Sequence, residues 1–111
     1  MLEEIYSTKD ASIAQRERSN SFILSYEDEE IAFKLCDLYA LRHQIMAIDV
    51  VELLDSHTPD IEIVYLAHCD KLWVLSTLQV LQFRELLNGT FDILALNSQI
   101  QKIFRRNVFN F

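Results

Sequence analysis

The segment from Asp60 to Phe104 constrains the fold more than any other part of this sequence. Its apolar periodicity predicts a strand, a helix, a second strand and a closing helix, in the ranges Ile61–Ala67, Thr77–Leu87, Phe91–Leu96 and Ser98–Arg105. Residues typical of turns and helix caps stand at the joints, namely Thr58-Pro59-Asp60, Ser76-Thr77, Asn88-Gly89 and Ser98. Such an alternation builds a β-sheet with helices packed on it.

The first twenty residues are polar and weakly periodic, so we expect residues 1–20 to form an N-terminal extension. This extension is either flexible or, through Leu2, Ile5 and Tyr6, an edge element of the sheet. Residues 21–111 then form a single domain, which is a common domain size.

The stretch after residue 20 allows two interpretations. Ser21–Tyr26 and Ile31–Cys36 are rich in β-forming residues, and the acidic run at residues 27–30 reads as a solvated hairpin turn between them. Alternatively, Asp28–Gln44 is a helix, because Ile31, Leu35, Leu38 and Leu41 also fit a helical stripe. Periodicity alone does not decide between the two.

A helix is predicted over Arg42–Ser56. Four apolar residues fall on one of its faces: Met46, Val50, Leu53 and Leu54. Thr58-Pro59-Asp60 then ends the helix, because the residue before a proline disfavours helical backbone.

The formal net charge of −7 is unevenly spread. Residues 1–62 carry 14 acids and 5 bases, whereas residues 63–111 carry 3 acids and 5 bases. The acidic half repels a polyanion, so we expect no nucleic acid partner. The basic group Lys102, Arg105 and Arg106 fits the last turn of a helix, where cations complement the helix dipole; a phosphate or partner contact is the alternative.

The sequence predicts a cytoplasmic protein without cofactor or metal. Charged residues and histidines interrupt every apolar run before it reaches membrane-spanning length, and the first residues lack signal-peptide features. We expect Cys36 and Cys69 to be reduced, buried thiols. His43, His57 and His68 show no metal-ligand spacing, and a single glycine excludes phosphate-cradling loops. No catalytic motif is present, so we expect no enzyme.

Three stretches together carry a resemblance to a known family. Cys36-Asp37-Leu38-Tyr39 occupies the place of a turn after a strand; Ile61–Leu66 leads through the loop Ala67–Trp73 to Val74-Leu75-Ser76-Thr77-Leu78; and Arg84–Ser98 follows as helix end, strand and helix start. Over residues 21–109 this order resembles a STAS domain, the sulfate transporter and anti-sigma-factor antagonist domain. The resemblance implies an α/β fold, a mixed β-sheet with helices packed mainly on one face. A ferredoxin-like α+β fold is the alternative if residues 28–44 are helical.

The resemblance implies a non-enzymatic regulatory module that binds other proteins, similar to anti-sigma-factor antagonists. In that family an Asp-Ser pair, with a phosphorylatable serine, opens the helix after the central strand, but here Val74 and Leu75 occupy those positions. A one-residue deletion puts Ser76 on the phosphosite, with Thr77 next to it. A helix N-terminus favours phosphate, and the alternative is that Ser76 or Thr77 only caps the helix.

The same resemblance implies a docking face over residues 71–82, with these contacts: Lys71, Trp73, Leu75, Ser76, Gln79 and Gln82. Trp73 is expected either as an exposed anchor or as a core residue. The implied partner is an anti-sigma kinase or, for an accessory subunit of an ABC lipid transporter, the transporter ATPase. A self-assembling structural subunit is a third hypothesis, with a homodimer formed through an apolar edge and the tail Val108-Phe109-Asn110-Phe111.

Overall fold

Residues 2–33 form a four-stranded antiparallel meander, because apolar and polar residues alternate and short polar turns separate the strands. The strands are β1 (Leu2–Ser7), β2 (Ala11–Arg16), β3 (Phe22–Tyr26) and β4 (Glu29–Phe33). One row of paired residues crosses the whole sheet on its inner face: Tyr6, Ile13, Leu24 and Ile31. In the computed structural model, residues 2–17, 19–55 and 60–109 are described, with the backbone alone at residues 55 and 101–109.

The meander decides between the alternatives that the sequence left open. Residues 2–7 form β1 at the edge of the sheet, and β2 pairs between β1 and β3. The hairpin predicted from Ser21–Tyr26 and Ile31–Cys36 is confirmed, with Glu27 in left-handed backbone (φ 51°) at the turn. The turn is shorter than the predicted residues 27–30, because Glu29 and Glu30 already pair with β3. The strand ends at Phe33, however, and a helix begins two residues later.

That helix is α1 (Leu35–Met46). Cys36–Tyr39 therefore lies in its first turns, and the prediction that these residues form a turn after a strand is wrong. Its start is fixed by two side chains: Asp37 accepts the Lys34 backbone N–H at 2.9 Å, and Asn20 accepts that of Leu35 at 2.8 Å. The inner face of α1 carries Leu38, Leu41 and Ile45.

The single helix predicted over residues 42–56 is wrong. Helix α1 ends at Met46, and a separate helix, α2 (Val50–Asp55), follows. At the start of α2, the Asp49 side chain accepts the Glu52 backbone N–H at 3.0 Å. Met46 is exposed, because the face of α1 that meets the core consists of Leu38, Leu41 and Ile45. Leu54, on the separate helix α2, is exposed as well. Residues 56–59, with Pro59 and His57, lie outside the described residues.

The next two strands form an antiparallel hairpin, β5 (Ile61–Leu66) and β6 (Lys71–Ser76). The predicted strand at Ile61–Ala67 is confirmed, but the predicted loop Ala67–Trp73 is wrong. Only residues 67–70 turn, with Asp70 in left-handed backbone (φ 53°). Residues 71–76 pair with β5 along their full length, because backbone donors and acceptors beside a strand are satisfied by continuing the ladder.

One helix, α3 (Thr77–Phe109), replaces the predicted helix, strand and helix. The predicted helix end at Asn88-Gly89, the strand Phe91–Leu96 and the helix start at Ser98 are therefore wrong. Gly89 is a packing glycine: a Cβ built there would lie 2.5 Å from the Tyr6 ring. The glycine thus lets β1 approach the helix closely and does not end it.

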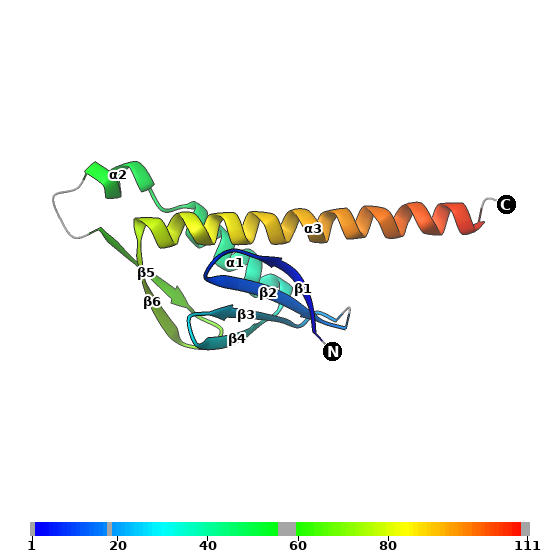
Figure 1. The fold of residues 1–111 in the computed structure, drawn as a ribbon, viewed down its shortest axis with the longest axis horizontal. Coiled ribbons are helices and arrows are strands. Elements are labelled where there is room, and N and C mark those ends of the chain that lie inside the picture. The colour runs from blue at the N-terminus through cyan, green and yellow to red at the C-terminus, as the bar shows by residue number, and fades with distance from the viewer. Residues whose placement is uncertain (1, 18, 56–59, 110–111) are drawn as a thin grey trace.

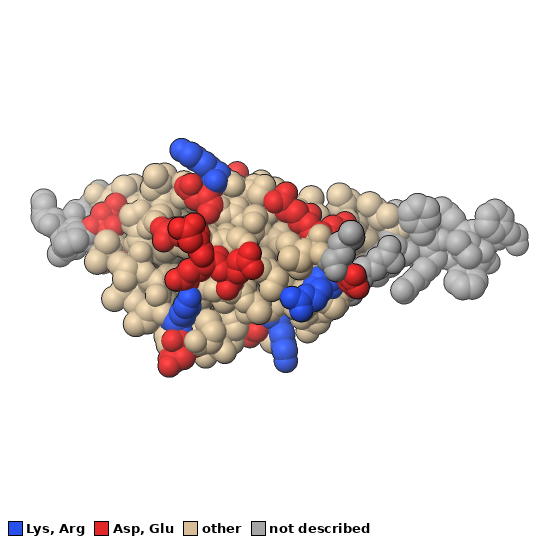
Figure 2. All heavy atoms as spheres, turned by 60° about the horizontal axis from the view of Figure 1, so that its bottom comes forward, with Lys and Arg blue, Asp and Glu red and all other residues tan. Residues whose placement is uncertain are grey.

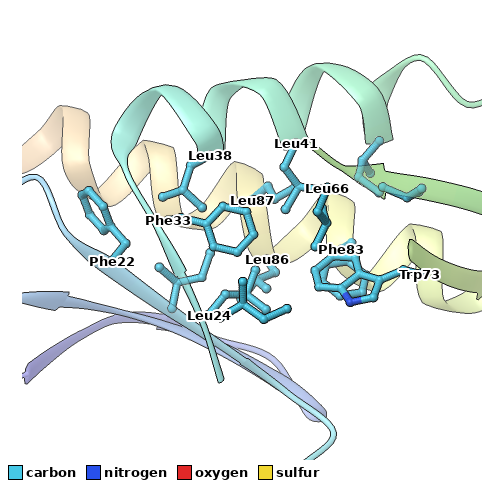
Figure 3. Close-up of a cluster of buried hydrophobic side chains, with 14 of the residues drawn as sticks. Phe22, Leu24, Phe33, Leu38, Leu41, Leu66, Trp73, Phe83, Leu86 and Leu87 are labelled. Atoms are coloured by element: carbon cyan, nitrogen blue, oxygen red, sulfur yellow. The ribbon is translucent and has the colours of Figure 1, made fainter. Parts of the chain in front are cut away.

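The two sheets and the helices meet in one apolar core (Figure 3). Leu38 and Leu41 of α1 point into the same space as Phe33 of the sheet and Leu87 of α3. Figure 1 shows α1 and α3 lying on the same side of the four-stranded sheet. The predicted fold class, a sheet with helices packed mainly on one face, is confirmed, and the arrangement is α+β with antiparallel pairing in both described sheets.

We expect Gly89→Ala to lower the free energy of unfolding by up to about 2 kcal/mol. Alanine favours a helix over glycine by about 1 kcal/mol, but the added methyl group displaces the Tyr6 ring, and overpacking costs about 1–3 kcal/mol. Urea denaturation measures the change. In a Tyr6→Ala background the same substitution should stabilise the protein by about 1 kcal/mol. A destabilisation that persists without the ring would contradict this explanation of Gly89.

Candidate functional site: the outer face of the β5–β6 hairpin

Strand β6 turns Trp73 and Leu75 into the core. Trp73 is 7% exposed and Leu75 is 1% exposed. The Trp73 ring stacks on Phe83 of α3 at a centroid distance of 4.8 Å, and Tyr26 of β3 meets both rings edge-on. The expectation of Trp73 as an exposed anchor is therefore wrong, and its alternative as a core residue is confirmed. Leu75 shares this face of the strand, so neither side chain can reach a partner.

The opposite face of the same hairpin is apolar and open to solvent. Because side chains alternate along a strand, the neighbours of the buried residues point outward together. Their exposed fractions lie between 46% for Tyr65 and 63% for Leu72. We call this surface the hairpin face; it consists of Ile61, Ile63, Tyr65, Leu72 and Val74. Cross-strand pairs hold it together, since Ile63 is opposite Val74 and Tyr65 is opposite Leu72.

Contacts near its turn fix the hairpin to the rest of the molecule. A ring nitrogen of His68 donates to the Ala32 carbonyl at 2.9 Å, and the His68 ring lies 4.4 Å from that of Phe33. Lys71 forms an ion pair with Glu29. On α1, the Gln44 side-chain amide bonds both the N–H (3.1 Å) and the carbonyl (3.0 Å) of Tyr65. Gln44 thereby satisfies the outward backbone groups of β5 at Tyr65.

An acidic hollow of about 450 Å³ adjoins the hairpin on the α1–α2 side. Its lining includes Asp49, Glu52 and Glu62 together with Gln44 and Ile48. No cluster of three or more metal-ligating side chains exists among the described residues. The hollow meets β5 at Glu62, which is paired with the buried Leu75, so it adjoins the hairpin on the side of its buried face.

Ser76 and Thr77 open α3, as predicted. The Ser76 N–H donates to the Gln79 side-chain oxygen at 2.9 Å, and the Gln79 N–H donates to the Ser76 hydroxyl at 3.3 Å. This reciprocal pair is a capping box, so the capping role of Ser76 is confirmed. Thr77 is buried, and its hydroxyl donates to Asp60. Phosphorylation of either residue stays a prediction.

The remaining predicted contacts are engaged within the chain or only partly exposed. Lys71 pairs with Glu29, as described above. The Gln79 side chain also donates to the Tyr26 hydroxyl at 2.6 Å, and burial raises the pKa of that phenol. Gln82 is half-buried beside a small hollow at the start of α3. Residues 71–82 thus include β6, but the large apolar side chains that β6 exposes are Leu72 and Val74, which the prediction did not name.

The thiols and histidines among the described residues form no metal-binding cluster. Cys36 and Cys69 are free, as expected, but both are exposed, because the strand context assumed for them is a helix and a turn. His43 and His68 are exposed. No helix within the described residues is both long and apolar enough for a membrane span.

The sequence held a signal for the hairpin face that our prediction missed. Residues 61–66 and 71–75 are almost continuously apolar, which fits strands buried on both faces, as in parallel sheets. An antiparallel hairpin next to one core buries only one face. Continuous apolar character in such a hairpin therefore indicates that a second apolar face is left exposed to solvent.

Comparisons with protein families, with curated proteins and with solved structures find no match to this chain. The fold and the hairpin face define the chain as an α+β domain with an exposed apolar β-surface.

Substitution of Trp73 should destabilise the fold strongly, whereas substitution of its neighbour Val74 should have little effect. Trp73→Ala should lower the free energy of unfolding by about 3–5 kcal/mol, because it leaves a cavity against Phe83 and Tyr26. Val74→Thr should change it by less than about 0.5 kcal/mol, since the side chain is exposed and stays β-branched. Urea denaturation of both variants checks this. Equal losses would mean that both faces of the hairpin are covered.

The hairpin face contains a phenol with a shifted pKa. The Tyr65 hydroxyl donates to Asp70 at 2.7 Å, and this bond, with smaller effects of desolvation and Cys69, raises the pKa of Tyr65. Because the folded chain holds this proton more tightly than the unfolded chain, the contribution to stability is present below the unfolded pKa and is lost as pH rises through the folded pKa.

Asp70→Asn should therefore lower the pKa of Tyr65 toward its ordinary value, because the carboxylate charge that opposes phenolate formation is gone. Asparagine tolerates the left-handed backbone of this position, so the turn should persist. Ring-labelled tyrosine NMR across alkaline pH follows each phenol separately, with Tyr26 as the internal control. An unchanged Tyr65 titration would show that Asp70 is not the cause.

Proposed function

We propose that this protein is a non-enzymatic protein-binding module whose binding surface is the hairpin face. One observation carries the proposal: five large apolar side chains stand exposed side by side on two paired strands. Exposed apolar patches of this kind mark protein-binding sites more often than isolated surface residues do. The surface is built on strands, which hold side chains in fixed positions and lower the entropy cost of binding.

The chemistry of the surroundings suggests the character of the partner. The acidic hollow with Asp49, Glu52 and Glu62 borders the hairpin, and Asp60 lies at its open end. A partner that buries the hairpin face and carries basic side chains at its rim would match both features. An anti-sigma kinase and a transporter ATPase, the partners implied by the resemblance, stay predictions within this class.

We place the interaction in the cytosol. Cys36 and Cys69 are exposed and unpaired, and a reducing compartment keeps such thiols free.

A photocrosslinking amino acid at position 63 tests the proposal in the source cell. Ile63 lies in the middle of the hairpin face, so we expect crosslinks to one protein other than this chain. Adding Leu72→Lys and Val74→Lys should reduce that product at least tenfold, because two buried charges oppose docking. The same amino acid at Ala32, which is exposed on β4, is the matched control. Equal products from both positions, or products with this chain alone, would overturn the proposal.

A further inference from the structure

The two edges of the β5–β6 hairpin differ in how their backbone groups are satisfied. In an antiparallel pair, every second residue directs its N–H and its carbonyl away from the neighbouring strand. On β5 these residues include Tyr65, because both of its backbone groups bond to the Gln44 side chain. Tyr65 is opposite Leu72, so the outward backbone groups of β6 belong to Leu72, Val74 and Ser76.

The outer edge of β6 is open at Leu72 and Val74. At the next outward position, the Ser76 N–H donates to the Gln79 side-chain oxygen at 2.9 Å. Within the part of the chain that the structure describes, no strand and no side chain bonds to the outward backbone groups of Leu72 and Val74. Such an edge accepts an extended chain as a further strand, because the added residues form main-chain hydrogen bonds with it.

The small hollow at the start of α3 reaches the same edge and has a volume of about 470 Å³. Its lining includes Ser76 of β6 and Tyr26 of β3, together with Asp10 and Glu27. Burial raises the pKa of Tyr26, and the charges of Glu27 and Asp10 raise it further, so both carboxylates act on this space. The Tyr26 ring meets that of Trp73, so the hollow lies toward the buried face of β6.

The surroundings of this edge are acidic. Residues 1–62 carry 14 acids and 5 bases, and Figure 2 shows acidic side chains gathered on one face of the molecule. The one base on β6, Lys71, is already paired with Glu29. Lysine or arginine side chains of a segment at this edge would therefore complement Asp10 and Glu27.

We propose that the partner of the hairpin face adds an extended segment to the outer edge of β6, with apolar and basic side chains in alternation. This docking mode rests on the proposed function of the hairpin face, which the added strand continues. Side chains alternate between the two faces of such a strand. One set lies beside Leu72 and Val74 and extends the apolar surface. The other set lies toward Asp10 and Glu27, where basic groups are favoured.

A second copy of β6 does not supply such a segment. Its side chains on the face away from the hairpin face are those of Lys71, Trp73 and Leu75. Trp73 and Leu75 are buried in the core of their own chain, and Lys71 is paired with Glu29. A second copy therefore brings no free basic group to the hollow, and the occupant is a segment of another protein.

Amide hydrogen exchange in the presence of a model segment tests the edge directly. The probe is a short peptide, acetylated and amidated at its ends, in which lysine alternates with valine. The N–H groups of Leu72 and Val74 should exchange at least about tenfold more slowly in the complex, because they become hydrogen-bonded. The outward N–H of Ile63, opposite Val74, is the internal control and should keep its rate. A peptide that does not bind, or a slowing at Ile63 as large as at Val74, would overturn the proposal.

Two matched proline variants separate the edge of β6 from that of β5. Val74→Pro removes an outward N–H and leaves the bonds to β5, so it should raise the dissociation constant of the peptide about tenfold or more by blocking the edge. Ile63→Pro removes the opposite outward N–H and should change this constant by less than about threefold, because the β5 edge lies one strand further from the peptide. Val74→Thr keeps the N–H and should bind like the wild type. Equal effects of the two prolines would contradict docking on β6.

The charge of the segment is tested with a second peptide, in which glutamate replaces lysine. It should bind at least about tenfold more weakly, because it meets Asp10 and Glu27. Asp10→Asn combined with Glu27→Asn should remove this difference, and asparagine tolerates the left-handed backbone of residue 27. Equal binding of both peptides to the wild type would overturn the basic character of the segment. These results are independent of the crosslink from position 63, whose loss would count against the proposed function itself.

Discussion

The contact between Phe83 and Trp73 holds this molecule together. Phe83 comes from the middle of the buried face of α3, Trp73 comes from β6, and Tyr26 of β3 meets both rings. Through these three rings, the four-stranded sheet, the hairpin and the helix share one core. A two-stranded hairpin is at best marginally stable alone in water, so its order depends on this contact. Because Trp73 points into the core, its neighbours along β6 point outward and form part of the hairpin face.

That inward position creates the candidate site. Alternation along β6 requires that if Trp73 is buried, Leu72 and Val74 are exposed. Exposing a row of large apolar side chains lowers solubility and invites aggregation, and no element among the described residues covers them. Gln44 occupies the backbone edge of β5 at Tyr65. In the proposed interaction, therefore, the exposed side chains of the hairpin face select the partner.

The sequence by itself determined the local events: the acidic hairpin turn, the strand at β5, the capping box at Ser76 and the apolar residues that fill the core. These depend on neighbours a few residues apart, which a linear pattern contains. The tertiary structure alone decided the fate of Gly89 and of the residues after it. Asn88-Gly89 is a helix stop by local chemistry, but the ring of Tyr6, 83 positions earlier in the chain, takes the space beside Gly89 and the helix continues.

The tertiary structure also decided which face of β6 is buried. Trp73 and Leu72 are both apolar, and the sequence offers either one to the core. The place of Phe83 on α3 selects Trp73, because only one face of a strand can meet a given helix. The sequence thus determined that β6 is apolar on both sides, and packing against α3 decided which side remains free for a partner.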